Sequence, residues 1–377
     1  MESGLTHGSG RFRIEPAGRE DARALGELES RIAMPGKIRF VFGREPDYFN
    51  ALRVEGNEAT VHVCRNSETG GIVGCAHRCV RTVYLNGAPA EVGYLGGLRL
   101  EERWRGGRIL AKAFRHLRDF DRDGRVPFHL TSIMEDNRAA MSVLSSGRAG
   151  LPVYHDRGRF AAMAIGMKRT PSITDRSLEV RSADASDAGM ILDFLSAEGP
   201  GRQFYPAYGP EDFGDDGRLL YGLAWSDIAL AFRSGRLVGA VGAWDQRRYR
   251  QWRVTGYAAS LRLFRGALNG VAALRGLPRL PAAGEPLRYF TLALNCVEQG
   301  DPVVFSSLLA YLIGSHRASH DFFLAGLHEA DPLLPVLAAL PHVPLPGRLH
   351  LVAWPDRADA VASLDPRRMP YLELGSL

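Results

Sequence analysis

An arginine- and glycine-rich turn joins an apolar stretch to an amphipathic one. Residues 105–108 read Arg-Gly-Gly-Arg, and Ile109 and Leu110 directly after them open an apolar repeat at helical spacing. The N-terminus of a helix presents unpaired backbone N–H groups and a partial positive charge, and small residues let a phosphate approach the backbone. Arginine side chains add charge-assisted hydrogen bonds. The sequence therefore predicts an anion-binding site at this turn.

Basic residues continue along the predicted helix. Arg108, Lys112 and Arg115 recur at spacings of four and three, which places them on one helical face. This face could reach a further phosphate, or it could be an ordinary solvated face. The net charge is only +5, but of the 47 basic residues just Lys37, Lys112 and Lys168 are lysines. Such an arginine-rich surface favours anionic ligands such as phosphates or carboxylates.

Side chains that could move protons lie on both sides of this turn. Glu91, in the apolar stretch before it, is the first candidate for a general base. Glu135 and Asp136 follow the next apolar stretch and are further carboxylate candidates, whereas Tyr94 and Tyr154 carry phenols that could donate a proton. Each carboxylate also has an ordinary structural interpretation, as a strand-edge charge or a turn former.

The four cysteines do not form a metal-ligand pattern. Cys75 and Cys79 are expected on one face of a strand with His77 between them, while Cys64 and Cys296 are isolated in the sequence. No Cys-x-x-Cys pair or second cluster at ligand spacing accompanies them. We expect small buried thiols in a reducing compartment and no metal site. For His77 we expect a structural role, although its imidazole could reach a cleft.

The elements that position these residues form a meander followed by alternating helices and strands. The Asn86-Gly87 pair is typical of a type I′ hairpin turn. Periodicity and turn residues predict the following elements: strand 13–15, helix 20–32, strands 60–65, 72–84 and 91–100, helix 109–120, strand 128–134, helix 138–144 and strand 160–167.

A second cycle of similar elements follows a polar linker at residues 169–177. Its opening resembles that of the first cycle, so the sequence contains a weak internal repeat and we predict two domains, 10–168 and 178–377. The second cycle predicts these elements: helix 184–195, strands 228–232, 237–244 and 288–297, a helix starting at 301–302, strand 322–327, helix 333–340 and strand 349–354.

Residues 252–286 have no counterpart in the first cycle and are treated as an insertion. This segment is basic and amphipathic, because arginines alternate with apolar residues at helical spacing. Its apolar residues are Leu261, Leu263, Phe264, Leu268, Val271 and Leu274, and its arginines include Arg262, Arg265 and Arg275. The insertion could lie on a membrane surface, cover a cleft or pack across the second domain.

Composition excludes several classes of protein. The hydrophobic fraction of 45% and the charged fraction of 24% are those of a globular chain that can bury a core. Aromatic residues are not interleaved with arginine and no long basic run occurs, so nucleic-acid binding is not expected. No apolar stretch approaches about 18 residues, and no signal-peptide apolar region is present near the start. We expect a soluble, cytoplasmic protein whose oligomeric state the sequence does not specify.

The order of elements over residues 12–167 resembles that of the GNAT acyltransferase superfamily. The resemblance rests on strand 98–100, the turn 103–107, and Glu135-Asp136-Asn137 followed by Ala140. It implies a mixed α/β (α+β) sheet, a second GNAT-like domain after the linker, and an acetyl-CoA site in the first. The positions implied for the cofactor are Leu98, Arg99, Leu100, Arg105, Gly106, Gly107, Arg108, Ile109, Leu110 and Asn137.

The sequence departs from the family pattern at two places. Counted from Arg105, the family's small fourth and sixth turn residues are replaced by Arg108 and Leu110. The tyrosine that often acts as general acid in the family falls at Leu144, which cannot transfer a proton. The general acid must therefore be another group, and the phenols of Tyr94 and Tyr154 are candidates for that role.

The matching turn of the second cycle has the opposite character. Residues 297–302 read Val-Glu-Gln-Gly-Asp-Pro, so acids replace arginines and Pro302 lacks an N–H donor. We expect this domain to have lost CoA binding and to shape an acceptor pocket, as the resemblance implies.

The sequence as a whole favours an acyl-CoA-dependent N-acyltransferase, an enzyme of class EC 2.3.1 that transfers an acetyl group to a small-molecule or peptide amine. The alternatives are a non-catalytic GNAT-fold binding or regulatory protein and a tandem aminoacyl or long-chain acyl transferase. Catalytic candidates are Glu91, Tyr94 and Glu135, and no metal is expected.

Overall fold

The first half of the chain contains the predicted meander and the two strand-helix units that follow it. The computed structural model describes residues 10–32, 38–105, 108–147, 150–214 and 216–377. The elements of this half are β1 (Phe12–Pro16), α1 (Ala22–Arg31), β2 (Ile38–Gly43), a 3-10 helix (Asn50–Glu55), β3 (Glu58–Asn66), β4 (Ile72–Leu85), β5 (Ala88–Leu100), α2 (Ile109–Phe120), β6 (His129–Met134), α3 (Arg138–Leu144) and β7 (Val153–Gly166).

The second half repeats this order of strands and helices. Its elements are β8 (Glu179–Ser182), α4 (Ala188–Glu198), β9 (Ile228–Arg233), β10 (Arg236–Trp244), β11 (Gln251–Tyr257), α5 (Ala259–Arg275), β12 (Tyr289–Val297), α6 (Pro302–His316), β13 (Phe322–His328), α7 (Leu334–Ala338), β14 (His342–Pro344), β15 (Gly347–Ala353) and α8 (Ala358–Ala362). The predicted elements are present with shifted ends, whereas β2, β11, β14 and α8 were not predicted.

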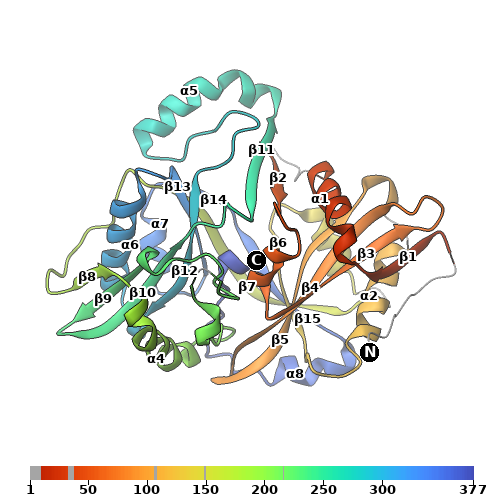
Figure 1. The fold of residues 1–377 in the computed structure, drawn as a ribbon, viewed down its shortest axis with the longest axis horizontal. Helices are drawn as coiled ribbons and strands as arrows, with labels where there is room; N and C mark the ends of the chain where they lie inside the picture. The colour runs from red at the N-terminus through yellow and green to blue at the C-terminus, as the bar shows by residue number, and fades with distance from the viewer. Residues whose placement is uncertain (1–9, 33–37, 106–107, 148–149, 215) are drawn as a thin grey trace.

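One mixed sheet of 13 strands runs through both halves (Figure 1). Its order is β1-β3-β4-β5-β6-β15-β7-β13-β12-β10-β9-β8, and β14 adds to β7. Helix α1 packs on one face of the first half, against Cys75 of β4, whereas α2 and α3 pack on the opposite face, beside Leu95 of β5. The mixed α/β class predicted from the sequence is confirmed.

The two halves exchange strands at the centre of this sheet. Strand β15, from the end of the chain, lies between β6 and β7 and pairs antiparallel with both. Strand β7, from the first half, in turn pairs with β13 of the second half over residues 160–166. The sheet of each half is therefore completed by a strand from the other, and the predicted linker at 169–177 lies between β7 and β8.

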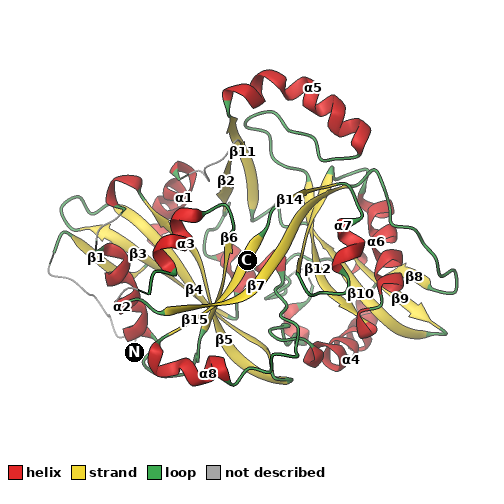
Figure 2. Cartoon of the chain, turned by 180° about the vertical axis from the view of Figure 1, so that it is seen from behind, coloured by secondary structure: helices red, strands yellow, loops and turns green. Residues whose placement is uncertain are grey.

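A second, two-stranded sheet joins the halves at another point. Strand β2 pairs antiparallel with β11, and α5 follows β11 at the edge of the molecule (Figures 1 and 2). β2 lies in a stretch for which the sequence predicted no helix or strand, and β11 and α5 form most of the insertion. Their pairing brings residues about 200 positions apart together, which local periodicity cannot indicate.

The hairpin turns follow the sequence signals. Asn86 and Gly87 both have positive φ (51° and 89°), and Ser234 and Gly235 repeat this geometry between β9 and β10 (52° and 74°), as a type I′ turn requires. All four cysteines are free and buried, as predicted. Among the described residues, no helix is long and apolar enough to cross a membrane.

Candidate functional site

Strands β5 and β6 run parallel but stay paired over only a short length. Their register joins Gly93 to His129 and Tyr94 to Leu130, although β5 extends to residue 100. On its other side β5 remains paired with β4 up to Leu100. Among the described residues, the edge of β5 from 95 to 100 that faces β6 therefore has no strand partner. Such an edge can bind an extended ligand through its backbone N–H and C=O groups.

The predicted cofactor strand lies along this open edge. The side chain of Leu98 is 45% exposed, and Arg99 and Leu100 pair on the other side with Cys75 and Gly74 of β4. The backbone of residues 98–100 is thus held by β4, and within the described ranges its second edge has no strand partner. Two carbonyl oxygens of these residues accept arginine side chains, Leu98 from Arg99 at 3.2 Å and Leu100 from Arg105 at 3.4 Å, and a ligand strand would replace these bonds.

A bulge bends β5 at the start of the open edge. The register with β4 shifts between the pairs Cys75–Arg99 and His77–Gly96, so that Gly97 and Leu98 lie opposite the single residue Ala76, and Gly97 has φ of +60°. A Cβ atom at either glycine would lie closer than 3.0 Å to the His77 ring. Glycine is required here for two reasons, the left-handed backbone and the close approach of the imidazole.

A basic pocket of about 670 Å³ lies where β5 leads into α2. Among the described residues, its walls contain six cationic side chains and no acidic one. They are Arg11, Arg103, Arg105, Arg108, Lys112 and Arg115, together with Gly10, Phe12, Trp104, Ile109 and Ala111. A pocket of this charge at the N-terminus of a helix attracts phosphate groups through both the cations and the helix amides.

The predicted anion-binding turn forms one wall of this pocket. Arg108 occupies the N-cap position of α2 and makes no side-chain cap, and Ile109 and Leu110 begin the helix. Arg105 Nε donates to the carbonyl oxygen of Leu100 at 3.4 Å. Within the described ranges neither Arg105 nor Arg108 has a carboxylate partner. The predicted positions Gly106 and Gly107 lie outside the described residues.

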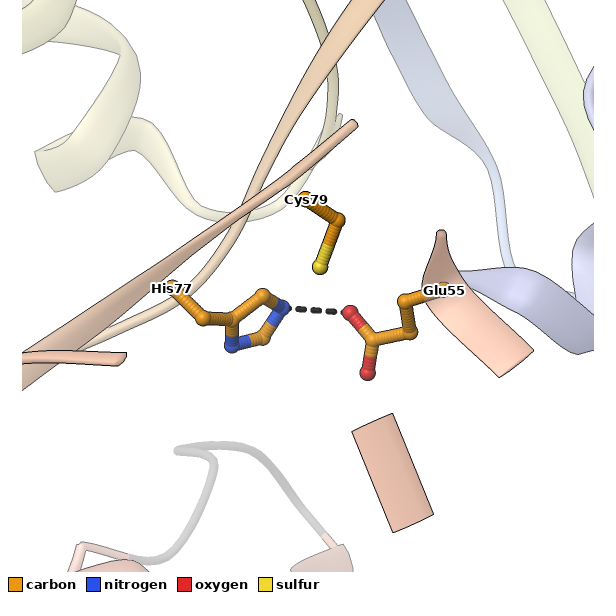
Figure 3. Close-up of side chains that lie close together, drawn as sticks. All are labelled: Glu55, His77 and Cys79. Carbon is orange, nitrogen blue, oxygen red and sulfur yellow. Dashed lines mark ion pairs between the residues drawn. The ribbon is translucent and has the colours of Figure 1, made fainter. Parts of the chain in front are cut away.

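A buried charged network lies on the other face of the sheet, beneath the bulge. Glu55 Oε2 lies 2.5 Å from His77 Nε2, and Cys79 is beside them (Figure 3). Glu55 also pairs with Arg44 at 3.0 Å and with Arg250 at 3.3 Å. Burial alone would raise the pKa of Glu55, but His77 and the two guanidinium groups lower it well below its usual range.

This cluster does not fit a metal ion. Glu55, His77 and Cys79 could supply three ligand atoms, but the carboxylate is already held by Arg44 and Arg250, whose positive charges would repel a cation. Burial also raises the pKa of the Cys79 thiol well above its usual value, which opposes the thiolate form that binds metals. The network is better suited to orienting His77 than to holding an ion.

Tyr94 lies on the same face as this network. It pairs with Cys79 in the β4–β5 register, and the guanidinium of Arg81 stacks over its ring at 4.7 Å. Arg81 in turn donates to the carbonyl oxygen of Ser376 at 2.9 Å. Burial raises the pKa of the Tyr94 phenol, so the group stays protonated and can act only as a proton donor in the neutral range.

Glu91 lies on the opposite face of β5, because Tyr94 is three positions further along a continuous register and successive side chains alternate between faces. Arg125 binds its carboxylate through two hydrogen bonds, at 2.5 and 2.6 Å. These bonds lower the pKa of Glu91. The structure therefore does not bring Glu91 together with Tyr94 or with the bulge.

The candidates after β6 are also engaged in structural contacts. Glu135 pairs with Arg159 at 3.1 Å, and Asn137 caps α3 by accepting a hydrogen bond from the Ala140 N–H at 3.2 Å. Tyr154 packs against Phe114 of α2, and burial raises the pKa of its phenol. Leu144 is buried in the same cluster.

The second half contains matching features with different chemistry. The Asp301 carboxylate caps α6 by accepting from the Val303 N–H at 2.8 Å, which fills the place an anion would take. In β12, Leu294 and Asn295 have positive φ (69° and 31°), as Gly97 does in β5. The buried carboxylate of Glu373 accepts from the Leu294 N–H at 2.8 Å. The backbone site in β12 that corresponds to the bulge of β5 is thus occupied by the side chain of Glu373.

Sequence reasoning did not single out Glu55, Arg44 or Arg250. Glu55 has one local signal, since it is an acid directly after the buried residues Leu52 and Val54. Arg44 and Arg250 come from distant segments and become neighbours only through the β2–β11 pairing.

No protein-family model matches the sequence, and no curated protein sequence matches it significantly. Solved structures do match. N-myristoyltransferase of Saccharomyces cerevisiae with bound myristoyl-CoA aligns with a TM-score of 0.59 at 11% identity, over 99% of this chain and 92% of that one.

Two further structures carry the same fold. A GCN5-related N-acetyltransferase from Anabaena variabilis aligns with a TM-score of 0.52 at 10% identity, over 90% of this chain and 72% of that chain. A GCN5-related glucosamine N-acetyltransferase region of a fungal multi-domain β-N-acetylglucosaminidase gives 0.57 at 12% identity, over 91% and 38%. The chain therefore has the GNAT fold, in a layout consistent with that of two-domain N-myristoyltransferase.

Proposed function

We propose that this protein is an acyl-CoA-dependent N-acyltransferase whose first half binds the acyl donor. The observation that carries the proposal is the continuity of the open β5 edge at residues 95–100 with the basic pocket at the start of α2. A ligand with an extended amide-bearing arm and a phosphorylated end matches both features, and CoA thioesters have that chemistry.

The donor binds in two parts. The phosphates lie in the basic pocket, on Arg105, Arg108 and the first amides of α2, while the pantetheine arm pairs with the backbone of Leu98 and Leu100. The thioester then reaches the bulge at Gly96 and Gly97, where the bent backbone can polarise its carbonyl group. Asn137 caps α3 in this arrangement. We propose that its side chain also contacts the donor.

The reaction is the attack of an amine nitrogen on the thioester carbonyl carbon. The C–N bond forms, the C–S bond breaks, the amine loses a proton and the CoA thiolate gains one. Holding both reactants in attack geometry supplies most of the rate. Glu91 is the candidate base predicted from the sequence, and the His77–Glu55 pair beneath the bulge, joined at 2.5 Å, is the alternative. Tyr94, kept protonated by burial, is the candidate acid.

Acetyl is the acyl group predicted from the sequence, and a long acyl chain is the alternative. The yeast protein to which the fold is similar was solved with myristoyl-CoA, and acetyltransferases share the same fold. A non-catalytic binding protein is the remaining possibility. It would bind CoA or its fragments without turnover.

The decisive experiment is the thermal midpoint of the purified protein with acetyl-CoA, myristoyl-CoA, CoA and AMP. A ligand at about 100 times its dissociation constant adds about 2.7 kcal/mol of stability. We expect a rise of several degrees with an acyl-CoA and none with AMP alone. Absence of any shift with both acyl donors would refute the CoA site. Thiol release on addition of amines then separates an enzyme from a binding protein.

A further inference from the structure

Helix α5 exposes an apolar face along its whole length. Leu263 is 78% exposed, Phe264 58% and Leu274 86%, and Leu268 and Val271 lie on the same face and are also exposed. At 100° per residue these side chains form one continuous stripe. Exposed apolar residues occurring singly are ordinary, but a continuous stripe on one helix indicates a binding surface.

The opposite face holds the helix on the molecule. Ala272 is buried, and the Asn269 side chain bonds both the N–H and the carbonyl oxygen of Leu280, at 2.8 and 3.0 Å. Lys168 donates to the Ala273 carbonyl oxygen at the end of the helix. These contacts come from the loop after α5 and from Lys168, which follows β7, and they hold the helix at the edge of the molecule (Figures 1 and 2).

The charge around the stripe has one sign. Residues 258–284, which contain α5 and the loop after it, hold four arginines (Arg262, Arg265, Arg275 and Arg279) and no aspartate or glutamate. Arg275 lies at the C-terminal end of the stripe, directly after Leu274, and Arg262 directly precedes Leu263 at its other end. Carboxylates of the supporting segments are already engaged, because Glu45 pairs with Arg253 at 3.0 Å and Glu285 accepts from the Ala282 N–H at 2.8 Å. The surface around α5 is therefore apolar in the middle and positive at its rim.

We propose that α5 docks the protein onto an anionic lipid bilayer. An apolar stripe flanked by arginines is the chemistry of a helix that lies in the plane of a membrane surface, with its apolar side chains among the acyl chains and its cations at the phosphates. At about 1.5 Å per residue its 17 residues extend roughly 25 Å along that plane. This function is separate from the acyl-donor site and does not depend on it.

A second copy of the chain is a poorer occupant of this surface. An antiparallel pair of α5 helices would place Arg262 and Arg275 of the two copies near one another, with no carboxylate between them. The like charges would repel. An anionic surface removes that repulsion and provides an apolar layer as well.

The test is co-sedimentation of the full chain with vesicles at low salt. One set contains phosphatidylcholine with phosphatidylglycerol, and the other contains phosphatidylcholine alone. We expect binding to the anionic vesicles, weakened by added salt. The variant Leu263→Ser/Phe264→Ser/Leu274→Ser should lower the partition coefficient by about tenfold or more, and Arg262→Glu/Arg275→Glu should lower it by about fivefold or more per arginine.

Matched controls separate this effect from unfolding and from net charge. Val143→Ser removes an exposed apolar side chain from α3, and Arg118→Glu/Arg367→Glu reverses two exposed arginines near α8, at the end of the molecule opposite α5 (Figure 1). Both controls should bind vesicles more tightly than their α5 counterparts. All substituted positions are exposed, so thermal midpoints should match that of the native protein.

Three results would overturn the proposal. The first is no sedimentation of the native chain with anionic vesicles. The second is equal binding to neutral vesicles without an effect of the arginine reversals. The third is a concentration-dependent dimer that the triple serine variant abolishes, which would assign the stripe to contact between copies.

Discussion

The imidazole of His77 fills the space that a side chain at Gly97 would need, so the bend in β5 and the buried histidine of β4 depend on each other. This relationship fixes where the open edge of β5 begins. It also connects the bulge to the Glu55 network on the same face, because His77 is held by Glu55 at 2.5 Å.

Replacing Gly97 by alanine should therefore destabilise the fold. The residue has φ of +60° and its Cβ would collide with the ring, so we expect a loss of roughly 2–4 kcal/mol in the free energy of unfolding. The double variant Gly97→Ala/His77→Ala should lose less than the sum of the two single changes. Gly26→Ala, in a helix with open space around it, should be neutral or stabilising. Simple additivity in chemical denaturation would show that the two residues are independent.

The arginines of the basic pocket should control affinity for the phosphorylated part of the donor. Arg105→Ala and Arg108→Ala should each weaken acetyl-CoA binding by about tenfold, since a charge-assisted hydrogen bond contributes on the order of 1.5–3 kcal/mol. Binding of an acetyl-pantetheine thioester without phosphates should not change. Isothermal titration calorimetry measures both, with Arg367→Ala as an exposed control. Equal losses for the two ligands would place the arginines outside a phosphate site.

The two candidate bases can be separated by turnover. If Glu91 accepts the proton, Glu91→Gln lowers kcat with little effect on donor affinity. If the His77–Glu55 pair does so, Glu91→Gln keeps full activity and Glu55→Gln lowers kcat. The thermal midpoint of Glu55→Gln must be measured beside its activity, because that change breaks a buried charge network and could unfold the protein. Full activity of Glu91→Gln would reject Glu91 as the base.

The buried Glu373 should make stability depend on pH. Burial raises its pKa to about 7, against an ordinary value near 4.5 in the unfolded chain. The folded state therefore binds the proton more tightly, and its stabilising effect is complete below about pH 4.5 and is lost as pH rises to 7. Relative to the native chain, the free energy of unfolding of Glu373→Gln should rise by about 2.5 kcal/mol between pH 5 and pH 8. If the thermal midpoints of the native chain and of Glu373→Gln changed in parallel across this pH range, the raised pKa of Glu373 would be contradicted.

The strand exchange should make each half depend on the other for folding. Residues 10–168 expressed alone lack β15, which pairs with both β6 and β7, so we expect no cooperative unfolding transition. Co-expressed with residues 178–377, the same fragment should form a stable complex that purifies through a tag on either piece. A fragment 10–168 that is folded on its own would show that its sheet closes without β15.

Most local elements could be predicted from the sequence because their causes are local. The helix at 109–120, the hairpin turn at Asn86-Gly87 and the strands of the meander follow from periodicity and from residues that favour positive φ. The GNAT order of elements was recognisable for the same reason. The anion-binding turn was also visible, since arginine, glycine and a helix start are adjacent in the chain.

The remaining features arise from pairing between distant segments. The sequence placed Glu91 on a strand, but only the register of β4 with β5 decides that its carboxylate faces Arg125 and that Tyr94 faces the opposite side. Glu55, Arg44 and Arg250 meet because β2 pairs with β11, across about 200 residues. The basic pocket likewise needs Arg11 of the first strand region beside Arg105. Residue types and local periodicity fix the elements, whereas long-range hydrogen bonding and burial choose which side chains share a site.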